Sequence, residues 1–317
     1  MMAFSIILLL SLLIERMMYM NNKCINDLIN QYPILNQVSD VLLLRNDAEN
    51  TIKDYLYGIA RFLKFINYDN EFEITQEHFV SYIIALNKTN LSKNTINSYN
   101  SYVRFFFEAV LDKPYNQYKV PKAKTEKKEI DYLMDHQILA LFNETASDSR
   151  DDCIIKLGVC CGLRIDEVAS LKVCNIHTKD SKKFIHIDHA KRNKQRNVLL
   201  DNTTYCAIQR YAKEYHIKPG TNEYFFQFRK NHKPCTQTIR IHFDKHKEAA
   251  GIQSSLTFHS LRHTYAVNFL VSGGDLLDLK YRLGHSSLAS TSHYLHFAKN
   301  MMKPGISYMD KLLKDVK

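Results

Sequence analysis

Residues 40–112 show apolar positions at helical spacing, interrupted only by short polar segments. Within residues 51–67 the apolar side chains fall on one stripe and the charged residues lie mostly off it, as in an amphipathic helix. Thr75 and Ser92 are suitable N-caps for two further helices, which run to about residues 84 and 110. The aromatic side chains on these stripes are expected to pack in a core rather than to stack on bases.

The chain from about residue 130 onward mixes helices with a few strands. Residues 151–161 predict a buried helix that is ended by Gly162, and a new helix begins near Arg164. Residues 183–187 and 197–200 predict two strands joined by a polar turn, a hairpin with a basic tip. Further helices are expected at 203–215, 236–250 and 259–271, the last two closed by glycines.

The segment 113–128 separates these two halves. It contains Pro114, Pro121 and many lysines but no apolar period, which is typical of an interdomain linker. The chain is therefore expected to be mainly α-helical with a small antiparallel sheet, an α+β organisation in which a helical module precedes a mixed one. The predicted parts are an extension at 1–20, a helical domain at 40–116, a linker at 117–130, a mixed domain at 131–300 and a C-terminal helix at 301–317.

The first residues of the chain are strongly apolar. Residues 3–14 are almost entirely hydrophobic, yet a membrane-spanning helix needs about 20 such residues. The basic leader and the small-residue cleavage site of a secretory signal are missing. We therefore expect a buried or mis-started extension, with Met17, Met18 or Met20 as alternative starts, and a membrane-associated segment as the second interpretation.

The charge balance favours a polyanionic partner. Lysine and arginine total 43 against 33 acidic residues, a net charge of +10, which suits nucleic acid or an anionic membrane. The seven cysteines form no CxxC pair and indicate reduced core thiols in a cytoplasmic protein. The 14 histidines show no HExxH or other ligand spacing, so neither a metal nor another cofactor is implied.

Four separated segments carry residues suited to attack on a phosphodiester. The first is GLRIDE at residues 162–167, where Arg164 follows a helix-ending glycine and lies beside free backbone N–H groups that favour a phosphate. Glu167, one helical turn later, can orient the Arg164 guanidinium. Taken alone, this segment fits an ordinary surface ion pair better.

The second and third segments add imidazoles, a second guanidinium and a phenol. His259 and Arg262 are three residues apart in HSLRH (259–263) and so share one helix face, where they can stabilise a phosphoryl oxygen that gains charge. Tyr294 follows His285 by nine residues, and a nucleophilic phenol needs nearby cations because its ordinary pKa is about 10. The alternatives are a solvated basic helix face and one ordinary tyrosine among 19.

The fourth segment is the basic tip of the predicted hairpin, HAKRNKQR at 189–196. A lysine in such a turn can enter a site and protonate a leaving oxygen. A plain basic turn has the same composition.

Together the four segments resemble the tyrosine recombinase or phage integrase family, whose pattern is Arg, a hairpin Lys, His-x-x-Arg, His or Trp, and Tyr. This chain has GLR-x-x-E, H-x-L-R-H and LGH-(8)-Y in the same order, within about residues 151–296. The resemblance implies a core-binding domain at 40–116, matched in outline only, and a catalytic domain at 131–300. No obvious extra DNA-binding domain precedes residue 40, which favours a simple Xer-like or mobile-element enzyme.

By this resemblance, Tyr294 attacks the scissile phosphate, which yields a 3′-phosphotyrosyl link and a free 5′-hydroxyl. The resemblance also implies that Arg164 and Arg262 bind the non-bridging oxygens and that Lys191 protonates the leaving oxygen. His259 would act as acid/base, and His285 would support the transition state. Glu167 would orient Arg164. The turn departs from the Gly-Lys-Gly of many relatives because Lys191 lies between Ala190 and Arg192, so Lys194 is an alternative acid.

The resemblance also implies partners. It implies double-stranded DNA rather than a small-molecule substrate, rejoining without ATP or metal, and a homo-tetramer on two duplexes, with accessory proteins as further partners. Residues 305–316 carry an apolar stripe and resemble the family's terminal helix, which docks on a neighbouring subunit; a helix that packs on its own chain is the alternative. The alternatives are a DNA-binding protein of the same fold without strand cleavage, a type IB topoisomerase-like enzyme that relaxes DNA, and a membrane-anchored protein.

Overall fold

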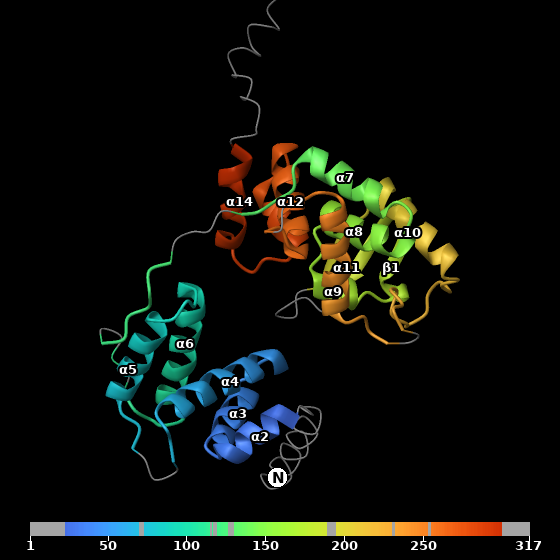
Figure 1. The fold of residues 1–317 in the computed structure, drawn as a ribbon. Coiled ribbons are helices and arrows are strands. Elements are labelled where there is room, and N and C mark those ends of the chain that lie inside the picture. Colours follow the sequence, from blue (N-terminus) through green and yellow to red (C-terminus); the bar gives the residue numbers. More distant parts are fainter. Residues whose placement is uncertain are drawn as a thin grey trace, which may run out of the picture. The chain divides into compact units, whose positions relative to one another are not determined.

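The computed structural model describes residues 23–69, 73–114, 116, 119–125, 130–188, 195–229, 232–252 and 255–299 (Figure 1). The chain divides into two compact units, residues 1–128 and 129–317. Helices dominate both units, and a three-stranded antiparallel sheet accompanies them, which confirms the predicted fold class. The predicted extension at 1–20 and C-terminal helix at 301–317 lie outside the described residues.

The first unit is a bundle of helices. Its described helices are α2 (Lys23–Gln31), α3 (Leu35–Leu44), α4 (Glu49–Phe65), α5 (Gln76–Asn87) and α6 (Lys93–Ala109). The helices predicted at 51–67, 75–84 and 92–110 are therefore confirmed, with ends that differ by one to three residues. Helix α6 begins as expected, because the Ser92 hydroxyl accepts a hydrogen bond from the Thr95 amide.

An aromatic core holds this bundle together. Phe62, Phe79, Phe106 and Phe107 are buried, and the rings of Phe79 and Phe107 stack with centroids 5.7 Å apart. Rings enclosed in this way cannot stack on bases, so the prediction of core packing is confirmed for these residues.

The second unit brings together segments that are distant in sequence. Its elements are α7 (Asp135–Thr145), α8 (Ser149–Cys161), α9 (Ile165–Ala169), η1 (Val173–Asn175), β1 (Ile176–Lys179), β2 (Lys182–Ile187), β3 (Arg196–Leu199), α10 (Asn202–Glu214), α11 (Thr236–Ala249), α12 (Phe258–Val271), α13 (Leu276–Leu283) and α14 (Ala289–Lys299). Helix α12 packs against α8 on one side and against α14 on another. Three of the four predicted chemical segments lie just after α8, at the start of α12, and in α14 with the loop before it, so this packing assembles them.

The sheet confirms the predicted hairpin and extends it. Strands β2 and β3 pair antiparallel, with Ile185 opposite Val198, and both of these side chains are buried. The sequence did not reveal β1, which pairs with the other edge of β2, because β1 is short and mostly exposed and has no apolar alternation.

The thiol prediction is only partly right. Cys153 and Cys161 are buried in the core of the second unit, but Cys206 and Cys235 are exposed free thiols. Cys206 lies on the solvent side of α10, where the polar neighbours of this amphipathic helix also lie.

Among the helices that the structure describes, none has the length and the apolar character that crossing a membrane requires.

The turn at Gly162 sets the position of Arg164. Helix α8 ends where Gly162 adopts a left-handed conformation with φ of 64°. A Cβ at this position would lie 2.5 Å from a ring carbon of Tyr265, so a larger residue has no space. The sharp turn allows Arg164 to become the N-cap of α9 immediately afterwards.

We expect Gly162→Ala to lower the free energy of unfolding of the second unit by more than the cost of a left-handed alanine, which is about 1–2 kcal/mol. The added methyl group must also displace Tyr265. Gly220→Ala is the matched control, because Gly220 has φ of 75° with nothing within 4 Å of its Cβ position. Chemical denaturation of both variants measures the difference, and equal losses would refute the packing argument.

Candidate active site

Arg164 and Glu167 form the first part of the site. The backbone N–H of Arg164 donates to Glu167 Oε2 and the guanidinium Nη1 donates to Oε1, both at 2.9 Å. The predicted partnership therefore exists in the structure. It is not an ordinary surface pair, because the Glu167 side chain is only 4% exposed.

Glu167 also binds two further arginines. Arg196, at the start of β3, donates from Nη1 and Nη2 to the two carboxylate oxygens at 2.9 and 2.8 Å. Arg262 Nη1 lies 3.9 Å from Oε2. Burial raises the pKa of the Glu167 carboxyl, but hydrogen bonds and charge from Arg196 and Arg164 outweigh it and lower the pKa to about 2. One buried carboxylate thus gathers three guanidinium groups.

Arg262 lies almost completely inside the protein, with 1% of its surface exposed. Its Nη1 donates to the carbonyl of Gly162 at 2.7 Å, and its Nη2 donates to the carbonyl of Leu283. Burial and then the neighbouring Arg164 lower its pKa to about 9, so the guanidinium stays charged at neutral pH. The two carbonyls fix the orientation of Arg262 without neutralising its charge.

Tyr294, on α14, is 3% exposed and lies beside two histidines. Its hydroxyl is 2.9 Å from Nδ1 of His263, and its ring stacks on His285 at 6.4 Å with an interplanar angle of 12°. Burial raises the pKa of the phenol, whereas the positive charges of Arg262 and Arg164 lower it. The phenol therefore lies within the field of both predicted phosphate-binding arginines.

The other predicted histidines are close to this phenol. His285 Nδ1 is 3.0 Å from the hydroxyl of Thr291, and burial followed by Arg262 and Arg164 lowers its pKa to about 4. His259 is exposed at the start of α12, with its ring edge-on to His263 at 4.6 Å. Partial desolvation of the ring and then the same two arginines lower the pKa of His259.

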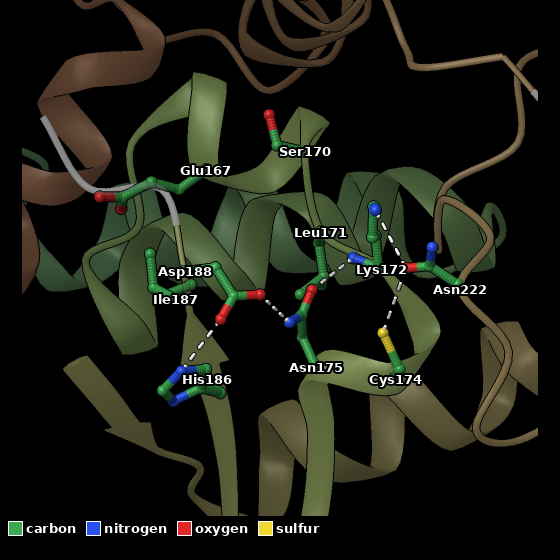
Figure 2. Close-up of a pocket in the computed structure, with 10 residues that line it drawn as sticks. All are labelled: Glu167, Ser170, Leu171, Lys172, Cys174, Asn175, His186, Ile187, Asp188 and Asn222. Atoms are coloured by element: carbon green, nitrogen blue, oxygen red, sulfur yellow. Dashed lines mark hydrogen bonds and ion pairs between the residues drawn. The ribbon is translucent and has the colours of Figure 1, made fainter. Parts of the chain in front are cut away.

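Of the predicted site residues, Lys191 lies outside the described residues. The structure does show how the chain enters and leaves this turn. Asp188, at the end of β2, accepts a hydrogen bond from Asn175 Nδ2 at 2.6 Å and lies 3.0 Å from His186 Nε2 (Figure 2). Asp188 lines a small pocket that Glu167 also lines, and Arg196, two residues after the turn, binds Glu167 directly.

The sequence patterns missed two residues of the site. Arg196 stood in a run of basic residues, and nothing in that run distinguishes it from its neighbours. His263 belonged to the HSLRH segment but received no role. Its position four residues after His259 is one helical turn away, and that spacing was the available signal.

The amino-acid sequence matches two family descriptions. The phage integrase family matches residues 126–301, and the N-terminal SAM-like domain of phage integrases matches residues 34–117. The chain belongs to the phage integrase family. The two matched regions together cover most of both units of this family member.

Named relatives agree with this membership. The integrase-family chain is 28% identical to a tyrosine recombinase of Pseudothermotoga lettingae over 275 residues, 83% of this chain and 93% of the relative. It is 24% identical to tyrosine recombinase XerC of Bacillus pumilus over 278 residues, 82% and 90% of the two chains.

Two solved structures share the fold of this phage integrase family member. XerH recombinase bound to its difH substrate has a TM-score of 0.67 at 19% identity, over 88% of this chain and 86% of that one. Lambda integrase bound to a core site has a TM-score of 0.67 at 16% identity, over 87% and 99%.

We expect Glu167→Gln to lower the free energy of unfolding by about 3 kcal/mol at pH 7. The folded-state pKa of Glu167 is depressed from 4.5 to about 2, so its contribution is fully present above about pH 4.5 and is lost as the pH falls toward 2. Urea denaturation of wild type and Glu167→Gln should therefore show a smaller difference in the free energy of unfolding at pH 3.5 than at pH 7.

Asp278→Asn is the matched control for this prediction. Asp278 pairs with Arg282 on the surface of the same unit, where its side chain is 48% exposed. Loss of this ion pair should lower the free energy of unfolding by less than about 1 kcal/mol. A difference between wild type and Glu167→Gln that does not change with pH would contradict the assigned cause.

Proposed function

We propose that this member of the phage integrase family is a site-specific recombinase that cuts and rejoins double-stranded DNA with Tyr294 as the covalent nucleophile. One observation carries the proposal: three guanidinium groups converge on Glu167, and the phenol of Tyr294 lies within the field of two of them. Few reactions need a buried phenol among several fixed cations, and nucleophilic attack on a phosphodiester is one of them.

The charges at the site match those of the reaction. Three arginines and one carboxylate, Glu167, leave two positive charges in the cluster. A phosphodiester carries one negative charge in the ground state and two in the pentavalent transition state. Fixed cations therefore stabilise the transition state more than the substrate, which is the condition for catalysis.

Each predicted residue has a role in this proposal. Tyr294 forms the bond to phosphorus, and Arg164 and Arg262 hold the non-bridging oxygens. His285, whose ring stacks on the nucleophile, supports the transition state, and His259 is proposed to act as an acid/base at the phosphate. Glu167 touches no substrate in this scheme and acts by positioning the arginines.

Lys191 is proposed as the acid that protonates the leaving 5′-oxygen. The support comes from the two ends of its turn, since Asp188 shares a pocket with Glu167 and Arg196 binds that carboxylate. The two described ends of the turn therefore lie beside the carboxylate that also binds Arg164. Lys194 lies in the same turn and is the competing candidate.

The assembly on DNA is proposed as a homo-tetramer that joins two duplexes in the cytoplasm, with accessory proteins as additional partners. The fold is shared with XerH and lambda integrase, both of which were solved bound to DNA. The net charge of +10 supports a DNA partner. Docking of residues 301–317 on a neighbouring subunit is part of the same proposal.

We expect Tyr294→Phe to abolish the covalent protein–DNA adduct on a nicked suicide substrate while DNA affinity stays within about twofold. The change removes one oxygen from a ring that remains packed on His285, so the fold and the cationic surface are kept. Denaturing gels measure the adduct, and mobility shifts measure binding.

Tyr215→Phe serves as its control. Tyr215 is a partly exposed tyrosine at the end of α10, and its loss should leave adduct formation unchanged. If Tyr294→Phe still forms the adduct, Tyr294 is not the nucleophile. If wild type binds DNA without any adduct, the alternative of a binding protein without cleavage is correct.

We expect Lys191→Ala to slow cleavage of an ordinary phosphodiester by about 10²–10⁴-fold. A substrate with sulfur in place of the 5′-bridging oxygen should restore the rate, because a thiolate leaves without a proton. Lys194→Ala, in the same turn, should cleave both substrates at nearly the wild-type rate. The reverse pattern would transfer the acid role to Lys194, and no rescue of either variant would refute an acid in this turn.

A further inference from the structure

His263 has no role in the scheme above, yet it makes the closest polar contact to the proposed nucleophile. Its Nδ1 lies 2.9 Å from the Tyr294 hydroxyl, and the two ring centroids are 5.6 Å apart. Within the described part of the chain, no other histidine ring nitrogen lies at hydrogen-bond distance from that phenol oxygen. His285 stacks on the phenol ring, but its own Nδ1 lies 3.0 Å from the Thr291 hydroxyl.

The surroundings of His263 decide which atom donates. Burial lowers its pKa to about 4, and so do His259 and Arg262 on its own helix, His293 on α14 and His285 in the loop before α14. The phenol, whose pKa is raised, keeps its proton at neutral pH. A neutral imidazole therefore accepts at Nδ1, and the Tyr294 O–H donates to it.

We infer that His263 is the proton acceptor for Tyr294 in strand cleavage and returns the same proton during rejoining. The inference rests on the proposed function and deepens it. When the phenol oxygen bonds to phosphorus, the bond between phosphorus and the 5′-oxygen breaks, the phenol proton moves to Nδ1, and the leaving oxygen takes a proton from the lysine. In rejoining, the 5′-hydroxyl attacks phosphorus and returns its proton to the lysine, the phosphotyrosyl bond breaks, and Nδ1 gives the proton back to the phenolate.

Bound DNA makes His263 a better base. Part of its low proton affinity comes from the positive charge of Arg262. A phosphate held by Arg262 and Arg164 places a negative charge beside those cations and opposes their effect on the imidazole. The acceptor thus strengthens when the substrate is in place, whereas the free protein keeps Tyr294 as a buried, protonated phenol.

The test separates a proton acceptor from a merely structural hydrogen bond. His263→Asn keeps an oxygen acceptor near the position of Nδ1 but cannot take up a proton, whereas His263→Ala removes both functions. We expect both variants to form the adduct about 10²-fold or more slowly than wild type at pH 7 in single-turnover cleavage of the suicide substrate. The rate of each variant should rise about tenfold per pH unit between pH 6 and 8, while the wild-type rate changes little.

Added imidazole provides the second measurement. It should accelerate His263→Ala in proportion to its concentration and leave wild type unchanged. His296→Ala is the matched control, because His296 is an exposed histidine on the same helix as Tyr294 and should keep the wild-type rate and pH profile.

Two outcomes would overturn the inference. One is cleavage by His263→Asn at the wild-type rate, which would leave His263 with a structural role only. This result would count against the inference even if His263→Ala fails to fold. The other is a slow His263→Ala whose pH profile matches wild type and which imidazole does not accelerate. An adduct formed by Tyr294→Phe in the same assay would instead defeat the proposed nucleophile, so the two failures are distinguishable.

Discussion

The buried carboxylate of Glu167 is the interaction on which the rest of the site depends. Three guanidinium groups from the N-cap of α9, the start of β3 and the first turn of α12 would repel one another in a common pocket if no anion lay between them. The hydrogen bonds that Glu167 accepts keep it ionised, with a pKa of about 2. The same contacts hold β3 and α9 together, so the fold and the cationic cluster depend on one side chain.

The cluster in turn influences the protonation of its neighbours. Because burial removes water from the imidazoles of His263 and His285, and the positive charge of Arg262 adds to this effect, their pKa values fall to about 4 and both rings are neutral. Neutral imidazoles can accept protons, and they do not compete with the arginines for the phosphate. In the proposed mechanism, the guanidinium groups supply positive charge and His263 accepts the proton of the phenol.

The sequence predicted those parts of the structure that depend on local pattern. Helices α4, α5 and α6 and the β2–β3 hairpin follow apolar periods, and Gly162 marks the end of α8. The motif order predicted that Arg164, Arg262, His285 and Tyr294 share a site, and the packing of α12 against α8 and α14 brings them together. The involvement of Arg196 and the contact between His263 and Tyr294 could not be predicted, because both arise from tertiary packing between elements that are 29 and 31 residues apart in sequence. Strand β1 was missed because it lacks an apolar face.

In the proposed reaction, one phenol placed among fixed cations becomes covalently linked to DNA. The most direct measurement is to trap the adduct on a nicked duplex, digest the protein and locate the nucleotide-bearing residue by mass spectrometry. We expect a single modified peptide in which Tyr294 carries the 3′-phosphate of the cleaved strand. A nucleotide on any other side chain, or a linkage to the 5′-phosphate, would contradict it.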